Sequence, residues 1–278
     1  MYRMIEACLF VPTSVDVEKL KAHVSGKTVL ITGASSGIGE QVAYQLATID
    51  CQLILVARRE ERLLEMKRDI ESDKAKVLTY IADLRKVEEL EGFLEMLHQL
   101  GRLDIVVSNA GISINRSIED SLARYHDFTR TMAINYFAPV KLLLSTIPLL
   151  EKTHGQIINV STINSLLQPI PHWAAYQASK SAFDTWLRSA APELASSGIT
   201  TTSIYLPLVR SPMIMPTKHY AKMPAMSSAH AAKIICKSMY TKQSFYRPWW
   251  LLFGQIISVL FRRLIESFSA TYLKKRGK

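Results

Sequence analysis

A glycine-rich run from Thr32 to Gly39 constrains this chain more than any other feature, because of what lies on either side of it. The apolar, β-branched residues 27–31 before it are typical of a buried strand. After it, Ile38, Val42 and Leu46 recur at helical spacing. A glycine turn between a strand and a helix brings backbone N–H groups and the positive end of a helix dipole within reach of a phosphate. Three glycines alone often form only a tight turn. Placed between a strand and a helix, however, they predict a dinucleotide site.

Apolar strand-like runs and helical runs alternate along most of the chain. Apolar strands separated by helices indicate a parallel sheet covered on both faces. This is the Rossmann-type, doubly wound α/β architecture, in which ligands bind at the carboxyl ends of the strands. Further strands are expected at 52–57, 76–81, 103–108, 155–160 and 199–205, and helices at 60–71, 87–100, 125–150 and 173–196.

The chain divides into a leader, one catalytic domain and a C-terminal extension. Residues 1–25 form the leader, whose start is too short and too interrupted for a signal peptide. Residues 26–246 carry the strand and helix signals of a single domain. Four prolines between 207 and 230 predict a loop-rich insertion, which we interpret as a lid over the substrate. Residues 247–278 are an apolar and basic extension.

Composition and charge narrow the range of partners. Hydrophobic residues make up 48% of the chain, enough for a sizeable core and too many for global disorder. The net charge of +10 suits an anionic lipid, cofactor or substrate, and because no nucleic-acid-binding motif accompanies it we expect no nucleic-acid partner. Cys8, Cys51 and Cys236 are too widely spaced for a disulfide framework or a metal site, which fits a reducing cytoplasm.

Tyr176 and Lys180 are four residues apart, so they share one face of the expected helix. A free tyrosine has a pKa of about 10, and a nearby ammonium favours the phenolate and lowers that value. The pair can protonate a carbonyl oxygen as a hydride arrives, although ordinary helices also carry such pairs. Ser161 follows the fifth expected strand, at the sheet edge that holds the glycine run, where its hydroxyl can bind a substrate oxygen. Asn135 lies within the long helix, where an amide is usually only solvent-exposed.

Together these motifs resemble those of the short-chain dehydrogenase/reductase superfamily over roughly residues 26–212. The resemblance implies an oxidoreductase in which Tyr176 acts as the general acid in reduction and as the base in oxidation. Lys180 would bind the nicotinamide ribose and lower the pKa of the tyrosine, and Ser161 would orient the substrate oxygen. Asn135 would hold a water molecule in a proton relay to solvent.

The same resemblance implies a nicotinamide cofactor, and the end of the second strand indicates which one. Arg58 and Arg59 stand where an NAD site usually places a carboxylate, and a guanidinium matches the charge and geometry of a 2′-phosphate. We therefore expect NADP(H), with Arg58 as the main phosphate ligand and Arg59 and Ser35 assisting; a solvated basic turn is the alternative. The segment from Pro207 lacks a glycine that the family often has there. The expected cofactor-binding residues are Gly33, Ser35, Ser36, Gly37, Ile38, Gly39, Arg58, Arg59, Asp83, Leu84, Asn109, Ala110, Gly111, Tyr176, Lys180, Pro207, Val209 and Ser211.

Apolar side chains predict a hydrophobic small-molecule substrate. Residues 163–173 contain Leu166, Leu167, Ile170 and Trp173. The lid contributes methionines, which adapt to irregular apolar ligands, although such a lid can equally pack on the domain. The run 206–218 also resembles the matching segment of bacterial fatty acyl reductases within the superfamily. We therefore expect reduction of a long-chain lipid aldehyde or acyl thioester. The alternatives are a 3-keto lipid, a steroid or another small ketone or alcohol as substrate, and a catalytically idle NADP-binding sensor.

The extension 247–278 supports the lipid interpretation. Its apolar stretch is shorter than the roughly 20 residues that span a bilayer. Paired tryptophans at one end and Arg262 and Arg263 at the other predict peripheral contact with a membrane surface, while packing on the domain or on a sister subunit is the alternative. The superfamily commonly dimerises through helices equivalent to 125–150 and 173–196, so the resemblance also implies a homo-oligomer.

Overall fold

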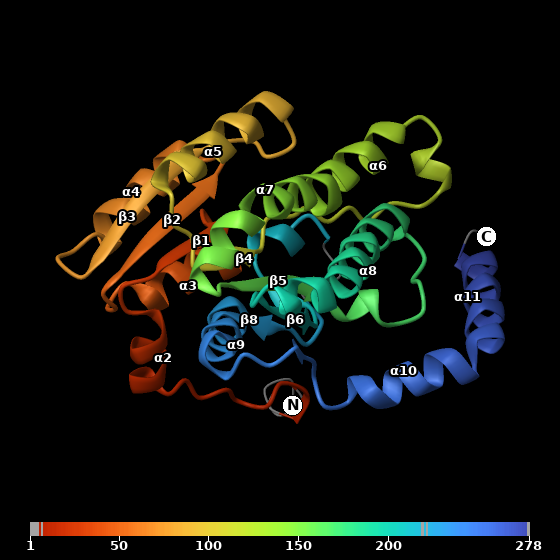
Figure 1. Ribbon diagram of the computed structural model, residues 1–278. Coiled ribbons are helices and arrows are strands. Elements are labelled where there is room, and N and C mark those ends of the chain that lie inside the picture. The colour runs from red at the N-terminus through yellow and green to blue at the C-terminus, as the bar shows by residue number, and fades with distance from the viewer. Residues whose placement is uncertain (1–5, 7, 218–219, 221, 277–278) are drawn as a thin grey trace.

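The computed structural model describes residues 6, 8–217, 220 and 222–276, which fold around one parallel sheet. Its strands are β1 (Thr28–Thr32), β2 (Cys51–Ala57), β3 (Ala75–Ile81), β4 (Ile105–Ser108), β5 (Gln156–Thr162), β6 (Thr200–Leu206) and β9 (Phe245–Tyr246). They follow the order β3-β2-β1-β4-β5-β6-β9, with helices on both faces (Figure 1). The expected doubly wound α/β fold is therefore confirmed, and its switch point lies between β1 and β4.

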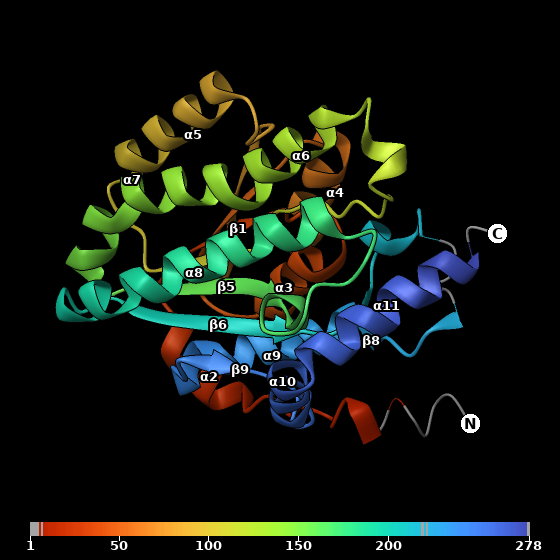
Figure 2. The same ribbon diagram turned by 90° about the vertical axis from the view of Figure 1, so that its right-hand side faces the viewer.

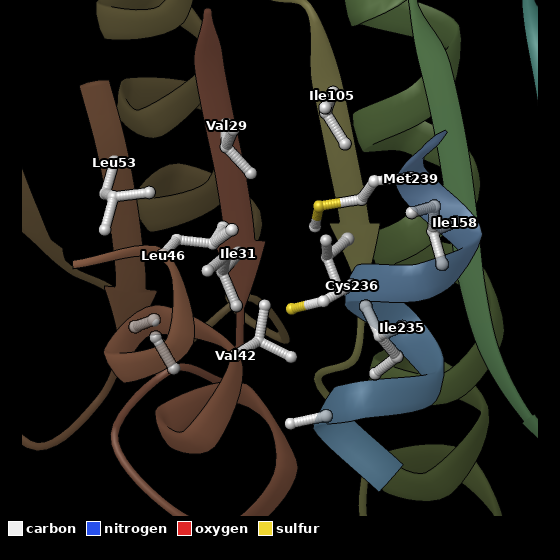
Figure 3. Close-up of a cluster of buried hydrophobic side chains, with 14 of the residues drawn as sticks. Val29, Ile31, Val42, Leu46, Leu53, Ile105, Ile158, Ile235, Cys236 and Met239 are labelled. Carbon is white, nitrogen blue, oxygen red and sulfur yellow. The ribbon is translucent and has the colours of Figure 1, made fainter. Parts of the chain in front are cut away.

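Helices cover the sheet as two layers. The described helices are α2 (Val17–Val24), α3 (Gly37–Leu46), α4 (Glu60–Ile70), α5 (Val87–Leu100), α6 (Tyr125–Met132), α7 (Ala138–Thr153), α8 (Ala174–Ser196), α9 (Ser228–Thr241), α10 (Leu251–Leu260) and α11 (Arg262–Arg276), and the last two lie apart from the sheet. Because strand side chains alternate between faces, Val29 and Ile31 lie in one core and Leu30 in the other. Val29 and Ile31 pack with Leu46 of α3 and Cys236 of α9 (Figure 3), whereas Leu30 shares its core with residues of α5, α7 and α8.

The long helix expected over 125–150 is one helical run in three parts. A π-helical segment, Ala133–Phe137, separates α6 from α7. The whole run, Tyr125–Thr153, is the one described helix that is long and apolar enough to cross a membrane, but half of its most apolar window is buried in the protein. It therefore belongs to the core, and the π segment places Asn135 inside it.

The region expected to be a loop-rich lid is more ordered than its prolines suggest. Short strands β7 (Val209–Arg210) and β8 (Met226–Ser227) pair in parallel, and α9 already begins at Ser228. Met226, which the methionine pattern assigned to the lid, is buried in the core beside α9. Both ends of this segment therefore have regular structure where a loop was expected, and its role as a substrate lid stays a prediction. Residues 218, 219 and 221 lie outside the described residues.

The leader packs beside α9. The described part of the leader includes α2, and Phe10 is buried in the core that α9 shares. The extension forms α10 and α11, which lead away from the sheet (Figures 1 and 2). Helix α9 and strand β9 are not among the elements expected from the sequence.

Candidate active site

A cleft of about 680 Å³ opens at the carboxyl ends of β1 to β6, across the switch point of the sheet. Its volume lies within the usual range for small-molecule sites. The cleft brings together all the expected site residues except Gly39 and Asn135, which lie beneath its wall. Those that line it are Gly33, Ser35, Ser36, Gly37, Ile38, Arg58, Arg59, Asp83, Leu84, Asn109, Ala110, Gly111, Ser161, Tyr176, Lys180, Pro207, Val209 and Ser211.

The glycine run forms a loop too close to its neighbours for side chains. Gly33 has a φ of +66°, and a Cβ there would lie 2.9 Å from the Cα of Ala110. A Cβ on Gly39 would lie 2.7 Å from both Asn109 Nδ2 and the carbonyl oxygen of Gly33. The loop therefore needs glycine at both positions, and its bare backbone leads straight into the N-terminus of α3. This cradle suits a pyrophosphate.

Thr32 fixes the end of β4 against the end of β1, a role that the sequence analysis missed. Its Oγ1 accepts hydrogen bonds from the backbone N–H groups of Asn109 and Ala110, both at 2.9 Å. Asn109 Nδ2 in turn donates to the Thr32 carbonyl oxygen at 2.9 Å. Thr32 is the first residue of the glycine run, and this position is the sequence signal that could have indicated its role. These bonds hold both sides of the switch point in one geometry.

Basic side chains gather at one end of the cleft. Arg59 donates from Nη2 to the Oγ and the carbonyl oxygen of Ser35, both at 3.0 Å. Arg58 instead faces Asp83, with Nη1 and Oδ2 3.9 Å apart. Arg85, which the sequence analysis did not single out, donates from Nε to Asp83 Oδ1 at 2.9 Å. Hydrogen bonds from Arg85 hold the pKa of Asp83 below its usual value. This end of the cleft therefore carries three guanidinium groups, two of which face the Asp83 carboxylate.

Tyr176 and Lys180 reach the cleft from one face of α8, as their spacing predicts. Lys180 Nζ donates to the carbonyl oxygen of Val160 at 3.0 Å, and burial lowers the pKa of this lysine to about 8. Burial raises the pKa of Tyr176, which a hydrogen bond with Thr162 partly opposes. The expected lowering of the Tyr176 pKa by Lys180 is therefore not found in the chain alone. Ser161 Oγ lies in the same cleft, 3.4 Å from Ser165 Oγ.

Asn135 is buried under the cleft rather than exposed on a helix, with 1% of its surface accessible. Its Nδ2 donates to the carbonyl oxygen of Ile112 and to Ser179 Oγ, both at 2.9 Å. Its Oδ1 accepts from the Ile112 N–H at 3.0 Å. A Cβ on Gly111 would lie 2.9 Å from that oxygen and 3.7 Å from Lys180 Nζ. Asn135 thus ties α8 to the chain after β4, and its role in a water relay stays a prediction.

The other end of the cleft is apolar. Trp173 packs edge-on against Tyr176, with ring centroids 5.7 Å apart, and stacks on Tyr220 at 5.6 Å. Gln177 fixes the loop before α8, donating to the Asn164 carbonyl oxygen at 2.6 Å and accepting from the Ile170 N–H at 3.0 Å. The apolar lining comes from Ile163, Ile170, Trp173, Met213, Ile214, Tyr220 and Met223.

Comparison with known proteins places the chain in a family. The model of the short chain dehydrogenases matches residues 27–222, so the chain belongs to the short-chain dehydrogenase family, as its motifs predict. A fatty acyl-CoA reductase of Acinetobacter baylyi is 40% identical over 77% of this chain and 73% of its own length. A fatty acyl-CoA reductase of Mycobacterium tuberculosis is 38% identical over 79% of this chain and 75% of its own.

A solved structure shares this architecture. It is a metagenomic short-chain oxidoreductase in complex with NADP, and it is 25% identical to this chain with a TM-score of 0.67. The match covers 81% of this chain and 96% of that one. The similarity extends over most of the catalytic domain, so the chain is an oxidoreductase of this family.

Proposed function

We propose that this chain is an NADPH-dependent reductase of the carbonyl group of a long-chain lipid, presented as an acyl thioester or an aldehyde. The cleft carries the proposal, because it joins a guanidinium-rich end to an apolar end and has the Tyr176 hydroxyl in its wall. The names of the Acinetobacter and Mycobacterium relatives support an acyl substrate. The complete set of Asn135, Ser161, Tyr176 and Lys180 argues against an idle cofactor sensor.

The residues of the basic end fit NADPH. The cleft reaches the backbone of Gly33 and Gly37, where a pyrophosphate can approach, and the N-terminus of α3 favours its charge. Arg58 and Arg59 line the cleft together, and either guanidinium can form charge-assisted bonds to a 2′-phosphate. Arg59 is held on Ser35 and Arg58 is turned toward Asp83, so we assign the phosphate to both arginines and give Arg59 the larger share.

NADPH, when bound, supplies the hydride, and the chain supplies the proton. Tyr176 keeps its proton on Oη at neutral pH because burial raises its pKa, and it donates that proton as the carbonyl oxygen gains charge. Ser161 offers a hydroxyl to the same oxygen. The ammonium of Lys180, one turn further along α8, favours the phenolate that remains. The stacked rings of Trp173 and Tyr220 line the apolar end.

We expect kcat/KM for reduction to fall as pH rises through about 8. Burial lowers the pKa of Lys180 from 10.5 to about 8, so its ammonium is present below that pH and is lost above it. Between about pH 8 and 10.5 the unfolded chain therefore binds more protons than the folded chain. The free energy of unfolding is expected to rise with pH across this range, because the buried ammonium that destabilises the fold is lost. Initial rates across the neutral to alkaline range test this. A rate that stays constant well above pH 8 contradicts the need for a charged Lys180.

NADPH oxidation with a series of acyl-CoAs and aldehydes of increasing length tests the substrate class. Each methylene that enters the apolar end is expected to raise kcat/KM about fourfold, since burying one contributes about 0.8 kcal/mol. Compact ketones and steroids serve as the comparison set. Activity confined to those compounds would replace the lipid proposal with the ketone or steroid alternative.

Two methionines of one turn make a matched pair for the same assay. Met213 lines the cleft, whereas Met215 is 76% exposed on its outer side. Met213→Ser is expected to weaken the dependence of kcat/KM on chain length, while Met215→Ser leaves it unchanged. Equal effects of the two substitutions would mean that this turn does not contact the substrate.

The expected homo-oligomer and cytoplasmic location stay predictions. Phe137 and Leu144 are exposed, two turns apart, on the helical run where self-association is expected. Their spacing places them on one side of that run. This side is the surface on which we propose that two copies meet.

A further inference from the structure

α10 carries its apolar face outward, the reverse of an ordinary surface helix. Leu251 is buried, and Gly254, Gln255 and Ser258 are the other residues of this helix that are partly covered. A Cβ on Gly254 would lie 3.4 Å from Leu167 Cδ2, so this side of the helix rests on the loop before α8. The exposed apolar residues, which lie away from that side, are Leu252, Phe253, Ile256, Ile257, Val259 and Leu260. The helix is therefore held by its small and polar side.

α11 extends the apolar surface and adds positive charge to it. Leu264 and Phe268, four residues apart on one face, are 66% and 73% exposed. Arg262 and Arg263, at the junction of the two helices, are exposed as well. Residues 247–278 contain seven lysines and arginines against a single acidic residue. The outer side of this helix pair is thus both apolar and cationic.

Two tryptophans fix this helix pair at its start. Trp249 Nε1 donates to the carbonyl oxygen of Cys8, and Trp250 Nε1 donates to that of Leu9, both at 3.1 Å. Trp249 nevertheless stays exposed beside the apolar side chains of α10. Indole rings with one apolar side and one bonded N–H favour the boundary between lipid and water. Trp249 and Trp250 would therefore lie at the boundary between a lipid surface and water.

We propose that the outer side of α10 and α11 is a bilayer-docking surface, on which both helices lie within the headgroup layer of an anionic membrane. Neither helix is long enough to span the hydrocarbon core, which takes about 20 apolar residues. An apolar face bordered by arginine and lysine is the pattern of helices that lie in the membrane interface. Anionic headgroups complement the excess of positive charge.

A second copy of the chain fits this surface less well. In a two-fold dimer the same patch meets itself, so both sides of the contact would carry the same excess of positive charge. Like charges at such a contact oppose association. An anionic lipid surface instead neutralises this charge while covering the apolar side chains.

The docking surface is directly connected to the apolar end of the cleft. Gln168 Nε2 donates to Glu266 Oε1 of α11 at 2.9 Å, and Leu167 meets α10. Both residues belong to the loop that supplies Ile170 and Trp173 to the cleft wall. A docked protein would therefore hold this wall near the bilayer, where long-chain lipids reside. This last step rests on the proposed function, whereas docking itself does not.

Co-sedimentation of the full chain with vesicles tests docking without any turnover. The vesicles are made of phosphatidylcholine alone or of equal parts phosphatidylcholine and phosphatidylglycerol. We expect binding to the anionic vesicles, and a loss of at least about tenfold when Phe253→Glu and Ile257→Glu are combined, since charges on the inserted face oppose binding. Arg262→Gln with Arg263→Gln is expected to lower partitioning by on the order of tenfold on anionic vesicles alone.

Val87→Glu is the matched control, because Val87 is an exposed apolar residue on α5, far from the docking surface (Figure 1). It should bind as the parent does. Docking is overturned if the parent stays in solution with anionic vesicles, or if the double glutamate variant binds equally well. It is also overturned if light scattering shows a dimer that this variant separates while vesicles bind neither protein.

A second measurement separates docking from the proposed function. Turnover of a long-chain aldehyde within vesicles should fall at least about tenfold in the double glutamate variant, in line with its lost membrane binding, while turnover of a short soluble aldehyde stays unchanged. Vesicle binding without acyl or aldehyde reduction would defeat the proposed function and leave docking intact. Reduction without vesicle binding would do the opposite.

Discussion

Tyr176→Phe is expected to lower kcat/KM by about 10²–10⁴-fold, the contribution of a positioned proton donor. Phenylalanine keeps the ring that Trp173 contacts edge-on, and it removes the one hydroxyl assigned to deliver the proton. Because the change is confined to Oη, NADPH binding should persist, which fluorescence titration measures. The effect should fall mainly on kcat, since the proton moves during the reaction and not on binding.

Tyr44→Phe is the control for this substitution. Tyr44 donates its hydroxyl to Asp69 at 2.8 Å on the outer side of α3, away from the cleft residues. Its removal should change turnover little. Full turnover in Tyr176→Phe, or a loss equal to that of Tyr44→Phe, would show that another group supplies the proton.

Arg59→Ala is expected to reduce the preference for NADPH over NADH by about 10- to 100-fold, because a charge-assisted hydrogen bond contributes about 1.5–3 kcal/mol. The guanidinium already lies against Ser35 beside the glycine loop, so little reorganisation is needed to reach a 2′-phosphate. Arg58→Ala should have a smaller effect, since that side chain is more than half exposed and leans toward Asp83. The measurement is kcat/KM for both cofactors with one substrate.

Arg62→Ala provides the comparison for charge alone. Arg62 pairs with Glu40 and Glu65 on the outside of α4, so its loss removes one positive charge without touching the cleft. The ratio of the two cofactors should stay as in the parent. A parallel decrease for NADPH and NADH in Arg59→Ala would mean that Arg59 supports the loop and does not recognise the phosphate.

The sequence predicts the centre of the sheet well because β1, β2 and β4 are buried on both faces and read as largely apolar runs. The strand β9 has only two residues and is formed by pairing with β6, so no local sequence pattern predicts it. The helix α9 was missed because prolines dominate the segment before it, although Ser227 caps it by accepting from the His230 N–H at 3.1 Å. Elements set by distant neighbours leave a weak local signal.

The site shows the same division. Spacing alone predicts that Tyr176 and Lys180 share a face, and the glycine run predicts the cradle. The pKa of Tyr176 could not be read in this way, since it depends on how deeply the ring is buried once the loop before α8 closes over it. The contacts of Arg85 with Asp83 and of Gln177 with that loop also arise only in three dimensions.

The hydrogen bonds from Trp249 and Trp250 to Cys8 and Leu9 connect the start of the C-terminal extension to the leader. Because α10 begins directly after these tryptophans, the orientation of α10 and α11 depends on residues more than 200 positions earlier. A purification tag fused ahead of Cys8, or a protease cut next to Leu9, is therefore expected to disturb the position of α10. Differently tagged proteins should therefore be compared with the state of both ends of the chain in mind.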